Sequence, residues 1–554
     1  MNAAAEPQGQ ATYVASKADR QWLLSTQRKL HARSWSHPDY VFQKLWGLVT
    51  DPRNLRIALA RVHRNRGRRT AGIDGVTVRK VLRSGAEDFL GQLRRELRTG
   101  GYRPSPARRV LIPKAGQLGK HRPLGIPTVK DRVVQAAMKN IMEPIFEADF
   151  YPNSFGFRPA KSAHMAVAYI KTLLLPRRAK RWGRAEQLPY QWAIEGDIKG
   201  CFDNISHHGL MDRVRRRLGD NKLNRLVLAF LKAGVMSEAQ FSRTDSGTPQ
   251  GGILSPLLAN IALSAIEERY ARHAWPRTLP PRGKALRGWK PMTDLAAIRQ
   301  RAFRSRAYDK RRGYVVLVPI RYADDFIILV SAPRGRDGQQ VALEEKAALA
   351  EQLERELGLQ LSEEKTLVTP VTESLRFLGH HVKVRTHPTH GRMVSTALIP
   401  KDRTKRLRWL IKRHFARNTL GMTLENRISQ LNRILRGWGN FYRHAWGAKR
   451  IFTSIDHHVW WTIKRWLLKK HPETRRRDLV KRYGWRKPGG RMVRWHDNGC
   501  KVVAMASITV CPYRLAWQKT PPFASTSVES PVRNERRTPG SVRGVRKPSG
   551  VDPE

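Results

Sequence analysis

The stretch "VVLVPIRYADDFIILVS" (residues 315–331) places two adjacent carboxylates between two apolar runs. Continuous apolar runs of this length favour buried strands, so "YADD" predicts a tight hairpin turn between two of them. Adjacent aspartates are common in surface turns, because Asp tolerates turn geometry. Here the buried flanks imply a rigid turn beside a core, where an unpaired charge is costly. We therefore expect Asp324 and Asp325 to bind a divalent cation, and hard oxygen ligands of this kind suit Mg²⁺.

A third carboxylate stands far upstream, in "EGDIKGCFDNI" (residues 195–205). Asp197 follows a predicted strand, and only the fold can bring it to Asp324 and Asp325. Three such carboxylates could hold two Mg²⁺ ions about 4 Å apart, which would activate a 3′-hydroxyl and stabilise a leaving pyrophosphate. Asp203, in the same segment, is expected to cap the helix that follows rather than to bind metal.

The charge of the chain indicates a polyanionic partner. Lys and Arg number 105 against 45 Asp and Glu, which gives a net charge of +60, and the basic residues recur from Arg28 to Arg546. Such an excess favours binding to a long nucleic acid, with a steep dependence on salt. Charge alone leaves a structural RNA-binding protein as open as an enzyme.

Cysteine usage and hydropathy bear on the compartment. Cys201, Cys500 and Cys511 form no CxxC pair, which is typical of a reducing cytoplasm. No apolar run approaches the length of a membrane span, and the first twenty residues lack a hydrophobic signal core. We expect a bacterial cytoplasmic, nucleoid-associated protein without membrane contact.

Two of these motifs carry a resemblance to a known family. "RYADDF" resembles the YxDD box of reverse transcriptases, and "DIKGCF" resembles their first catalytic-aspartate motif. The resemblance implies that Asp197, Asp324 and Asp325 are catalytic metal ligands, with a metal contact from the backbone carbonyl of Ile198. It also implies that Phe202 is a steric gate, whose ring leaves no room for a 2′-hydroxyl and so selects dNTPs.

Further boxes extend the match into the nucleotide pocket. "LIPKAGQLGKHRPLGIPTVKDRVVQ" (residues 111–135) resembles the fingers motif, and its Lys114 and Arg122 match the family's triphosphate contacts. "SGTPQGGILSPLLANIAL" (residues 246–263) is similar to the template and nucleotide box, in which Gln250 stands beside the incoming nucleotide. Glycines there allow close backbone approach.

The closing palm motifs complete the series. "LSEEKT" (residues 361–366), whose Lys365 is expected among the nucleotide-binding residues, and "FLGH" (residues 377–380) resemble the last two boxes. Any one box could arise by chance, but several stand in the family's order from Leu111 to His380.

Two segments outside these boxes narrow the resemblance to reverse transcriptases of group II introns. "AGIDGVT" (residues 71–77) resembles their N-terminal extension, and "ISQLNRILRGWGNFYRH" (residues 428–444) resembles their maturase-specific thumb, domain X. The resemblance implies a protein that binds its intron RNA, assists splicing and copies the RNA into DNA. The implied partners are group II intron RNA, target DNA and dNTPs, with a homodimer as a further expectation. The implied RNA contacts are Arg433, Arg436, Trp438 and Tyr442.

The expected fold is an α/β right-hand polymerase, with an antiparallel sheet in fingers and palm, joined to an α-helical thumb. The expected divisions are a flexible start (1–20), a helical extension (21–100), fingers and palm (101–390) with a basic insertion (274–313), a thumb (391–475), a basic DNA-binding segment (476–520) and a disordered basic tail (521–554).

One departure and several alternatives accompany this interpretation. Many family members end in an endonuclease domain with paired Cys and His, whereas this sequence offers His496, Cys500 and Cys511 without a CxxC partner, so we expect no endonuclease here. A non-catalytic RNA-binding splicing factor and a reverse transcriptase recruited to host defence or repair remain open. A viral RNA polymerase is disfavoured by Phe202.

Overall fold

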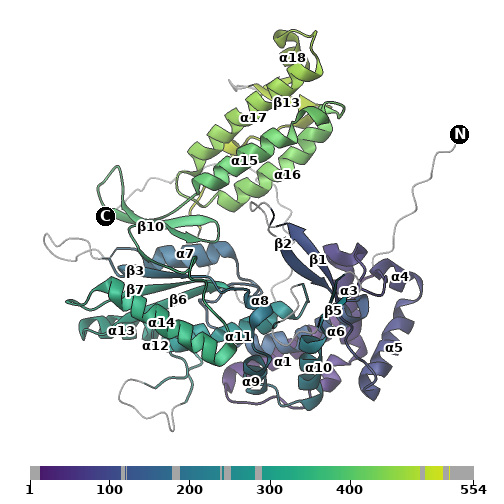
Figure 1. Ribbon diagram of the computed structural model, residues 1–554, viewed down its shortest axis with the longest axis vertical. Coiled ribbons are helices and arrows are strands. Elements are labelled where there is room, and N and C mark those ends of the chain that lie inside the picture. Colours follow the sequence, from purple (N-terminus) through teal and green to yellow (C-terminus); the bar gives the residue numbers. More distant parts are fainter. Residues whose placement is uncertain are drawn as a thin grey trace, which may run out of the picture.

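The computed structural model describes residues 13–113, 119, 121–176, 188–237, 240–242, 247, 251–280, 290–486, 493–513, 515 and 523. Figure 1 shows fingers and palm side by side, with a bundle of thumb helices rising above them. This is the expected α/β polymerase fold with a helical thumb.

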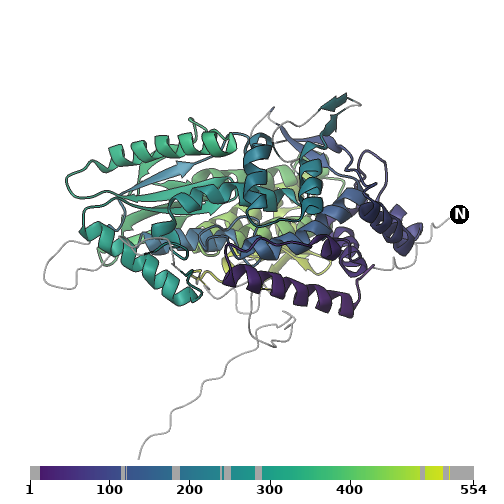
Figure 2. The same ribbon diagram turned by 90° about the horizontal axis from the view of Figure 1, so that it is seen from below.

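Helices form most of the outer fingers. They are α1 (Lys17–Ser36), α2 (Trp46–Val49), α3 (Pro52–Arg64), η1 (Arg66–Arg69), α4 (Val78–Arg83), α5 (Ala86–Thr99) and α6 (Val129–Glu147). Figure 2 shows α1 along the underside, where Gln27 donates to the carbonyl of Asn140 on α6 at 2.8 Å. Ser16 and Asp19 form a capping box that starts α1. The helix therefore begins inside the segment 1–20, which was expected to be flexible.

The fingers also carry a four-stranded sheet in the order β2-β1-β4-β5. Its strands are β1 (Ala107–Pro113), β2 (His121–Ile126), β4 (Val235–Ser237) and β5 (Gln240–Ser242). β1 pairs with β2 antiparallel and with β4 in parallel, so the last two strands reach the fingers from beyond the first palm strand.

The palm sheet has the order β6-β7-β3-β8 and is antiparallel throughout. Its strands are β3 (Trp192–Gly196), β6 (Val316–Tyr322), β7 (Asp325–Ser331) and β8 (Leu367–Pro370). Alternate residues of β7 enter two cores: Ile328 packs with α14, and Ile327 packs with α7. Both runs of the quoted stretch are thus buried, as predicted.

Helices cover this sheet and connect its strands. They are α7 (Ala163–Leu173), α8 (Cys201–Asn204), α9 (His207–Arg215), α10 (Asn221–Lys232), α11 (Ser255–Arg269), α12 (Ala271–Ala274), α13 (Leu295–Arg311) and α14 (Gly338–Leu357). The described part of the predicted insertion 274–313 thus includes α13. Ser206 caps α9 by accepting from Gly209 N, so the cap expected of Asp203 belongs to Ser206. Asp203 itself lies in α8.

A second palm sheet, in the order β11-β10-β9, joins the palm to the thumb. Its strands are β9 (Leu375–Phe377), β10 (His380–Thr386) and β11 (Met393–Leu398). Because β11 pairs with β10 over its whole length, the palm continues to Leu398, beyond the expected boundary at 390.

The thumb is built on α15 (Lys401–His414), α16 (Leu424–Tyr442) and α17 (Ala448–Lys470), with η2 (Arg417–Thr419) between the first two. Apolar residues of α16 that recur every three or four positions, Leu424, Ile428, Leu431 and Leu435, are in the core. Arg427 lies next to Ile428 and is only 6% exposed, and its guanidinium stands 5.9 Å from the ring centroid of Phe415.

The segment after the thumb folds onto it. It comprises α18 (Arg476–Tyr483), β12 (Gly484–Arg486), β13 (Val493–Asp497), β14 (Cys500–Lys501) and η3 (Met505–Ser507). Trp495 and Met505 are buried in the thumb core, and Asp456 of α17 accepts from the backbone N–H of Met505 and Ala506 at 2.8 Å. Residues 476–513 are therefore part of the same body as the thumb.

A helix that could cross a membrane is absent from the part of the chain described above.

Candidate active site

The two aspartates of the quoted stretch stand on a two-residue hairpin. Tyr322 pairs with Asp325 across the turn, which leaves Ala323 and Asp324 at its tip. Ala323 has φ of 60°, in the left-handed region that two-residue hairpin turns require. The turn is therefore tight and fixed in register, as its buried flanking strands predicted.

Asp197 is brought to this turn by strand pairing. β3 runs antiparallel to β7, and its last residue, Gly196, stands opposite Phe326. Asp197 and Asp325 are the next residues on the two strands, so their backbones leave the sheet at the same edge. Ile198 follows and forms an isolated bridge with Leu361 of the "LSEEKT" segment.

The three carboxylates influence one another. Desolvation by burial raises the pKa of Asp324, and the charge of Asp197 raises it further. Desolvation, followed by the charges of Asp324 and Asp197, raises the pKa of Asp325 to about 6. Asp325 is itself solvent-exposed, so water screens part of this effect. The site concentrates negative charge that its own residues do not neutralise.

Lys365 is the cation that partly offsets this charge. Its Nζ lies 2.7 Å from Oδ2 of Asp197, and this hydrogen bond raises the pKa of Lys365. Ser362 N donates to the carbonyl of Asp197 at 2.8 Å, which anchors the "LSEEKT" segment beside the site. Lys365, predicted to bind nucleotide, is thus within reach of the aspartates.

These residues fit divalent metal binding in donor type and charge. Carboxylate oxygens are the ligands that Mg²⁺ prefers, and an excess of negative charge is what a dication relieves. In the described residues, however, no three Asp, Glu, His or Cys side chains already stand in a metal-ligating arrangement. Lys365 holds an oxygen of Asp197, so ligation by Asp197 requires this ammonium to release it.

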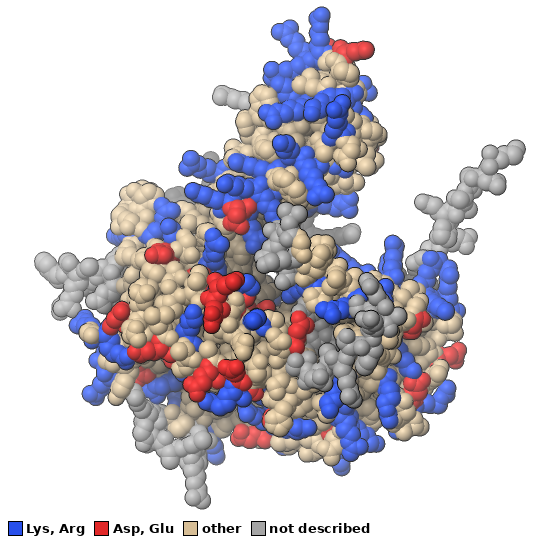
Figure 3. Space-filling view, in the orientation of Figure 1, with Lys and Arg blue, Asp and Glu red and all other residues tan. Residues whose placement is uncertain are grey.

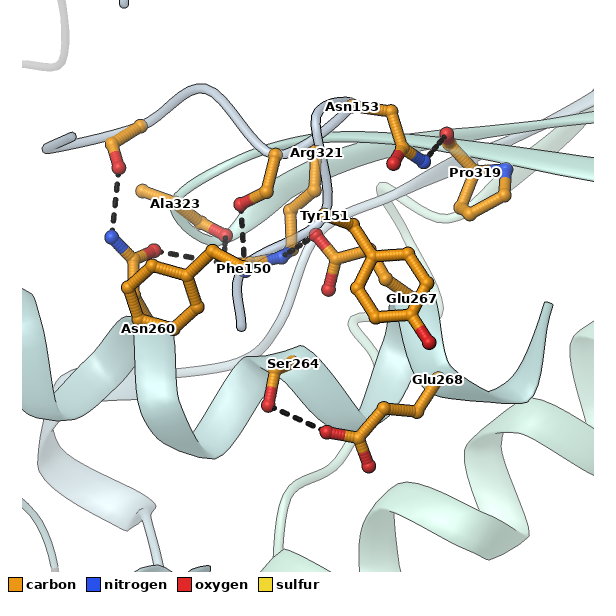
Figure 4. A network of polar contacts seen from close by, with 12 residues as sticks. Phe150, Tyr151, Asn153, Asn260, Ser264, Glu267, Glu268, Pro319, Arg321 and Ala323 are labelled. Carbon is orange, nitrogen blue, oxygen red and sulfur yellow. Dashed lines mark hydrogen bonds and ion pairs between the residues drawn. The ribbon is translucent and has the colours of Figure 1, made fainter. Parts of the chain in front are cut away.

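A buried guanidinium fixes the turn from behind (Figure 4). Arg321 is 0% exposed, and its Nε donates to Oε1 of Glu267 on α11 at 2.7 Å. Its Nη1 donates to Oδ1 of Asn260 at 3.0 Å and to the carbonyl of Ala323 at 3.1 Å, and its Nη2 donates to Oγ of Ser154 at 2.9 Å. One side chain therefore ties the turn to α11 and to the loop before α7.

That loop lies directly on the turn. Phe155 N donates to the carbonyl of Arg321 at 2.8 Å, and Asn260 Nδ2 donates to the carbonyl of Gly156 at 2.8 Å. A Cβ at Gly156 would stand 2.2 Å from the backbone nitrogen of Ala323. Only glycine allows this approach.

Phe202, the predicted steric gate, lies on α8 close to the aspartates. It is 9% exposed, and its ring stands edge-on to the ring of Phe157 at 6.1 Å between centroids. Phe157 is 49% exposed, with φ of 57°. The exposed and strained position of Phe157 makes it a second candidate for contact with substrate.

The predicted nucleotide contacts from the fingers are described in part. Arg122 is exposed on β2, and its charge lowers the pKa of Asp324, so it lies near enough to this aspartate to act on its charge. Lys114 and Gln250 lie outside the described residues. Gly247, which opens the box containing Gln250, packs where a Cβ would meet the carbonyl of Asp203 at 2.4 Å.

The predicted RNA contacts of the thumb differ in exposure. Arg433 and Arg436 are exposed on α16, and Trp438 is half-buried. Tyr442 is 4% exposed, and its hydroxyl donates to the carbonyl of Gly379 at 3.0 Å. The structure therefore gives Tyr442 a packing role between thumb and palm, because its ring is not available at the surface.

The structure shows contacts of several residues that the sequence interpretation did not single out. Arg321 and Glu267 are ordinary charged residues in sequence, and no spacing signals their pairing. Two exposed tryptophans on the thumb carry cations over their rings: Arg413 lies 5.3 Å from the ring centroid of Trp409, and Lys464 lies 4.4 Å from that of Trp461. The signal that the sequence offered for these two residues was tryptophan within segments rich in Lys and Arg.

Comparisons with known proteins agree with this geometry. Residues 112–382 match the family model "Reverse transcriptase (RNA-dependent DNA polymerase)", and residues 404–484 match "Group II intron, maturase-specific domain". The chain is 36% identical to Protein YkfC of Escherichia coli K12, over 74% of this chain and 98% of that protein. It is 35% identical to the group II intron-encoded protein LtrA of Lactococcus lactis, over 64% of this chain.

The chain belongs to the group II intron reverse transcriptase/maturase family. It is an RNA-directed DNA polymerase of this family with a maturase-specific thumb, as the motifs predicted. Reverse transcriptases use divalent metal, in keeping with the acidic cluster. The matched region spans 59% of the length of LtrA. A more distant relative is the putative COX1/OXI3 intron 2 protein of Saccharomyces cerevisiae, at 27% identity over 65% of this chain and 41% of that protein.

Proposed function

We propose that this reverse transcriptase copies its group II intron RNA into DNA at the edge of the palm sheet, using two Mg²⁺ ions held by Asp197, Asp324 and Asp325. The observation that carries the proposal is the register of β3 against β7, which sets Asp197 beside the turn. Bound Mg²⁺ would activate the primer hydroxyl and neutralise charge on the leaving pyrophosphate. The carbonyl of Ile198 is the proposed additional metal contact.

The residues around the aspartates divide the remaining tasks. Arg122 and Lys114 are proposed to hold triphosphate oxygens, and the effect of Arg122 on the pKa of Asp324 supports this role for Arg122. Lys365, once released from Asp197, is free to meet a nucleotide phosphate. Phe202 is proposed to exclude the 2′-hydroxyl, and Gln250 is proposed to flank the incoming nucleotide.

Primer extension on poly(rA)/oligo(dT) with dTTP and Mg²⁺ tests the catalytic proposal. Asp324→Asn should lower the extension rate by at least about a hundredfold, because it removes a charge that acts on the reacting atoms. RNA affinity should stay within about twofold, since the thumb is unchanged. Asp337→Asn is the matched control: this exposed residue caps α14, and Asn caps equally well. Extension by Asp324→Asn at the rate of the control would exclude the assignment.

The thumb is proposed to bind intron RNA and to assist its folding and splicing. Figure 3 shows Lys and Arg side chains crowded over the thumb helices. Arg433 and Arg436 can contact phosphates, while Trp409 and Trp461 offer stacking faces to unpaired bases. If Asp324→Asn still promotes splicing of the intron, polymerase and maturase functions are separable. Loss of splicing by Trp409→Ala with unchanged extension on poly(rA) would place the RNA contact on the thumb.

Target DNA is proposed to contact the basic segment 476–520, whose described residues pack on the thumb. Arg477 and Arg486 are exposed there. Reversing both charges should weaken binding of duplex target DNA more than binding of intron RNA, as measured by competition. The homodimer and the nucleoid association stay predictions, for sedimentation and localisation measurements to check.

A non-catalytic splicing factor is the alternative that the same assays separate. It predicts splicing activity with no extension on poly(rA)/oligo(dT) at any Mg²⁺ concentration. An intron RNA gene beside the coding sequence would favour the maturase over a reverse transcriptase recruited to host defence or repair.

A further inference from the structure

A cavity of about 190 Å³ lies where the palm meets the thumb, with its walls built from both. α7 and the β10–β11 pair supply the palm side, and residues at the end of α16 and in the 511–513 segment supply the thumb side. Its polar lining residues are His164, Lys171, Thr172, His380, Ser395, His444 and Tyr513. This joint is separate from the aspartates of the polymerase site.

The cavity has a cation without a described counter-ion. Burial lowers the pKa of Lys171, and no carboxylate contributes to that shift. The charges that act on His380 and His444 are likewise those of other histidines, Lys171 and Arg443. Among the described residues, then, the walls offer positive charge and no carboxylate.

The cavity also has a donor without a partner. Ser395 is 8% exposed, and its Oγ is buried with no hydrogen-bond partner. An unsatisfied buried hydroxyl costs free energy, so such a group in a native fold calls for an explanation. Ser395 lines the cavity, so a rotation of its side chain toward the cavity would let a ligand oxygen satisfy this hydroxyl.

The three histidines present acceptors. His164 Nε2 lies 2.7 Å from the carbonyl oxygen of Phe441, His380 Nδ1 lies 3.1 Å from that of Leu378, and His444 Nδ1 lies 2.8 Å from that of Cys511. A nitrogen that faces a carbonyl oxygen carries the proton, so in the neutral ring the other nitrogen is an acceptor. No hydrogen bond within the described residues engages these second nitrogens. The histidines do not form a metal-ligating group in the described part of the chain.

We propose that this palm–thumb cavity binds a phosphate group in a form that carries one protonated oxygen: inorganic hydrogen phosphate, or a phosphate monoester, such as the 5′-phosphate of an RNA, that takes up a proton as it binds. Its anionic oxygens accept from Lys171 and Ser395, and its P–O–H donates to an imidazole nitrogen. Sulfate has the same shape but no proton at neutral pH, so it lacks the donor that the imidazoles require. Because the walls come from palm and thumb, the bound group holds the two together.

A chain with a net charge of +60 attracts every anion, so binding of phosphate alone would not show a specific site. Comparing phosphate with sulfate separates the proposed site from this general attraction. At pH 7 and matched ionic strength, calorimetry should give a dissociation constant for phosphate at least about tenfold lower than that for sulfate. A tenfold difference corresponds to one hydrogen bond to a charged group. It should also raise the melting temperature more than sulfate does. Lys171→Gln and Ser395→Ala should weaken the binding of both anions, because these donors serve oxygens that phosphate and sulfate share. His444→Phe, which removes an imidazole acceptor from the cavity wall, should abolish most of the preference for phosphate. Lys29→Gln, which removes an exposed helical charge on α1, should keep it.

Ser395→Ala is the sharpest variant, since it removes an unpaired hydroxyl and should not destabilise the free protein. Equal responses to phosphate and sulfate in the wild type, unchanged phosphate affinity in Lys171→Gln, or a full phosphate preference in His444→Phe would each overturn the proposal. Primer extension by these variants on a 5′-hydroxyl template is measured in parallel. Loss of the phosphate preference with intact extension leaves the polymerase assignment unaffected.

The two sources of the phosphate are distinguished with one RNA sequence made with a 5′-phosphate and with a 5′-hydroxyl. Tighter binding of the phosphorylated form, lost in Lys171→Gln and kept in Lys29→Gln, identifies an RNA terminus as the ligand. Equal binding of the two RNAs, together with a phosphate preference over sulfate, identifies a free phosphate or small monoester.

Discussion

At the scale of single residues, Arg321 fixes the position of the turn that carries Asp324. Its guanidinium is fully buried and pairs with Glu267 while also holding the carbonyl of Ala323. Arg321→Met leaves the Glu267 carboxylate buried and unpaired, which should lower the free energy of unfolding by about 3–5 kcal/mol. Urea denaturation measures this loss, and primer extension should fall with it.

The double variant Arg321→Met/Glu267→Leu separates stability from positioning. Replacing both members of a buried pair with apolar groups restores much of the stability, because no charge is left unpaired. Extension should stay low, since Ala323 and Ser154 have lost their donor. Recovery of wild-type extension would mean that the pair serves stability alone.

His380 makes the stability of the protein depend on pH in the acidic range. Burial lowers its pKa from 6.5 to about 4. The unfolded chain therefore takes up a proton as the pH falls below about 6.5, while the folded chain does not until about pH 4. Stability present above pH 6.5 should be lost toward pH 4, by about 3 kcal/mol from this residue. His380→Gln should show a shallower fall of melting temperature over this range, and an unchanged slope would contradict the assignment.

Sequence reasoning at this scale singled out residues with a pattern around them and passed over those without one, and the catalytic roles of the aspartates stay predictions. Asp324 was recognisable because two apolar runs flank it, and Asp197 because it ends another. The Arg321–Glu267 pair, by contrast, depends on α11 crossing behind the turn. In a chain this rich in Lys and Arg, nothing in the sequence indicates which charged residue pairs with which. Tyr442 was misjudged because an aromatic beside arginines suits RNA and a core equally well.

At the scale of elements, the contact between the Gly156 loop and the hairpin is the least tolerant one. Gly156→Ala would push a methyl group into the backbone at Ala323, where the available gap is 2.2 Å. The backbone must shift, so extension should fall by about tenfold or more, in line with small displacements of reacting groups. Gly437→Ala is the control, since a Cβ there meets nothing within 4 Å.

The hairpin was predictable from the two apolar runs that flank it. Element boundaries were less so, because they depend on contacts that periodicity does not encode. β11 belongs to the palm through its pairing with β10, and residues 476–513 belong to the thumb through Trp495 and Met505. The start of α1 was missed although Ser16 and Asp19 are its cap.

At the scale of the whole molecule, the charge predicts how RNA binding responds to salt. Each phosphate contact that is lost should reduce the slope of log K against log salt concentration by about one. Arg433→Ala/Arg436→Ala should therefore flatten the slope by about two and weaken binding of different RNA sequences alike. Filter binding over a salt series measures this, and an unchanged slope would show that these two exposed arginines do not touch the phosphates.

The anchoring of residues 502–513 also has a consequence for the order in which the enzyme is made. Val502 and Met505 complete the thumb core, and Cys511 N donates to the carbonyl of Arg443 at 3.3 Å. A ribosome produces these residues after every catalytic motif has emerged. The nascent chain can therefore assemble its palm early, but it acquires a finished thumb only late in translation, so the RNA contact proposed for the thumb becomes available only then.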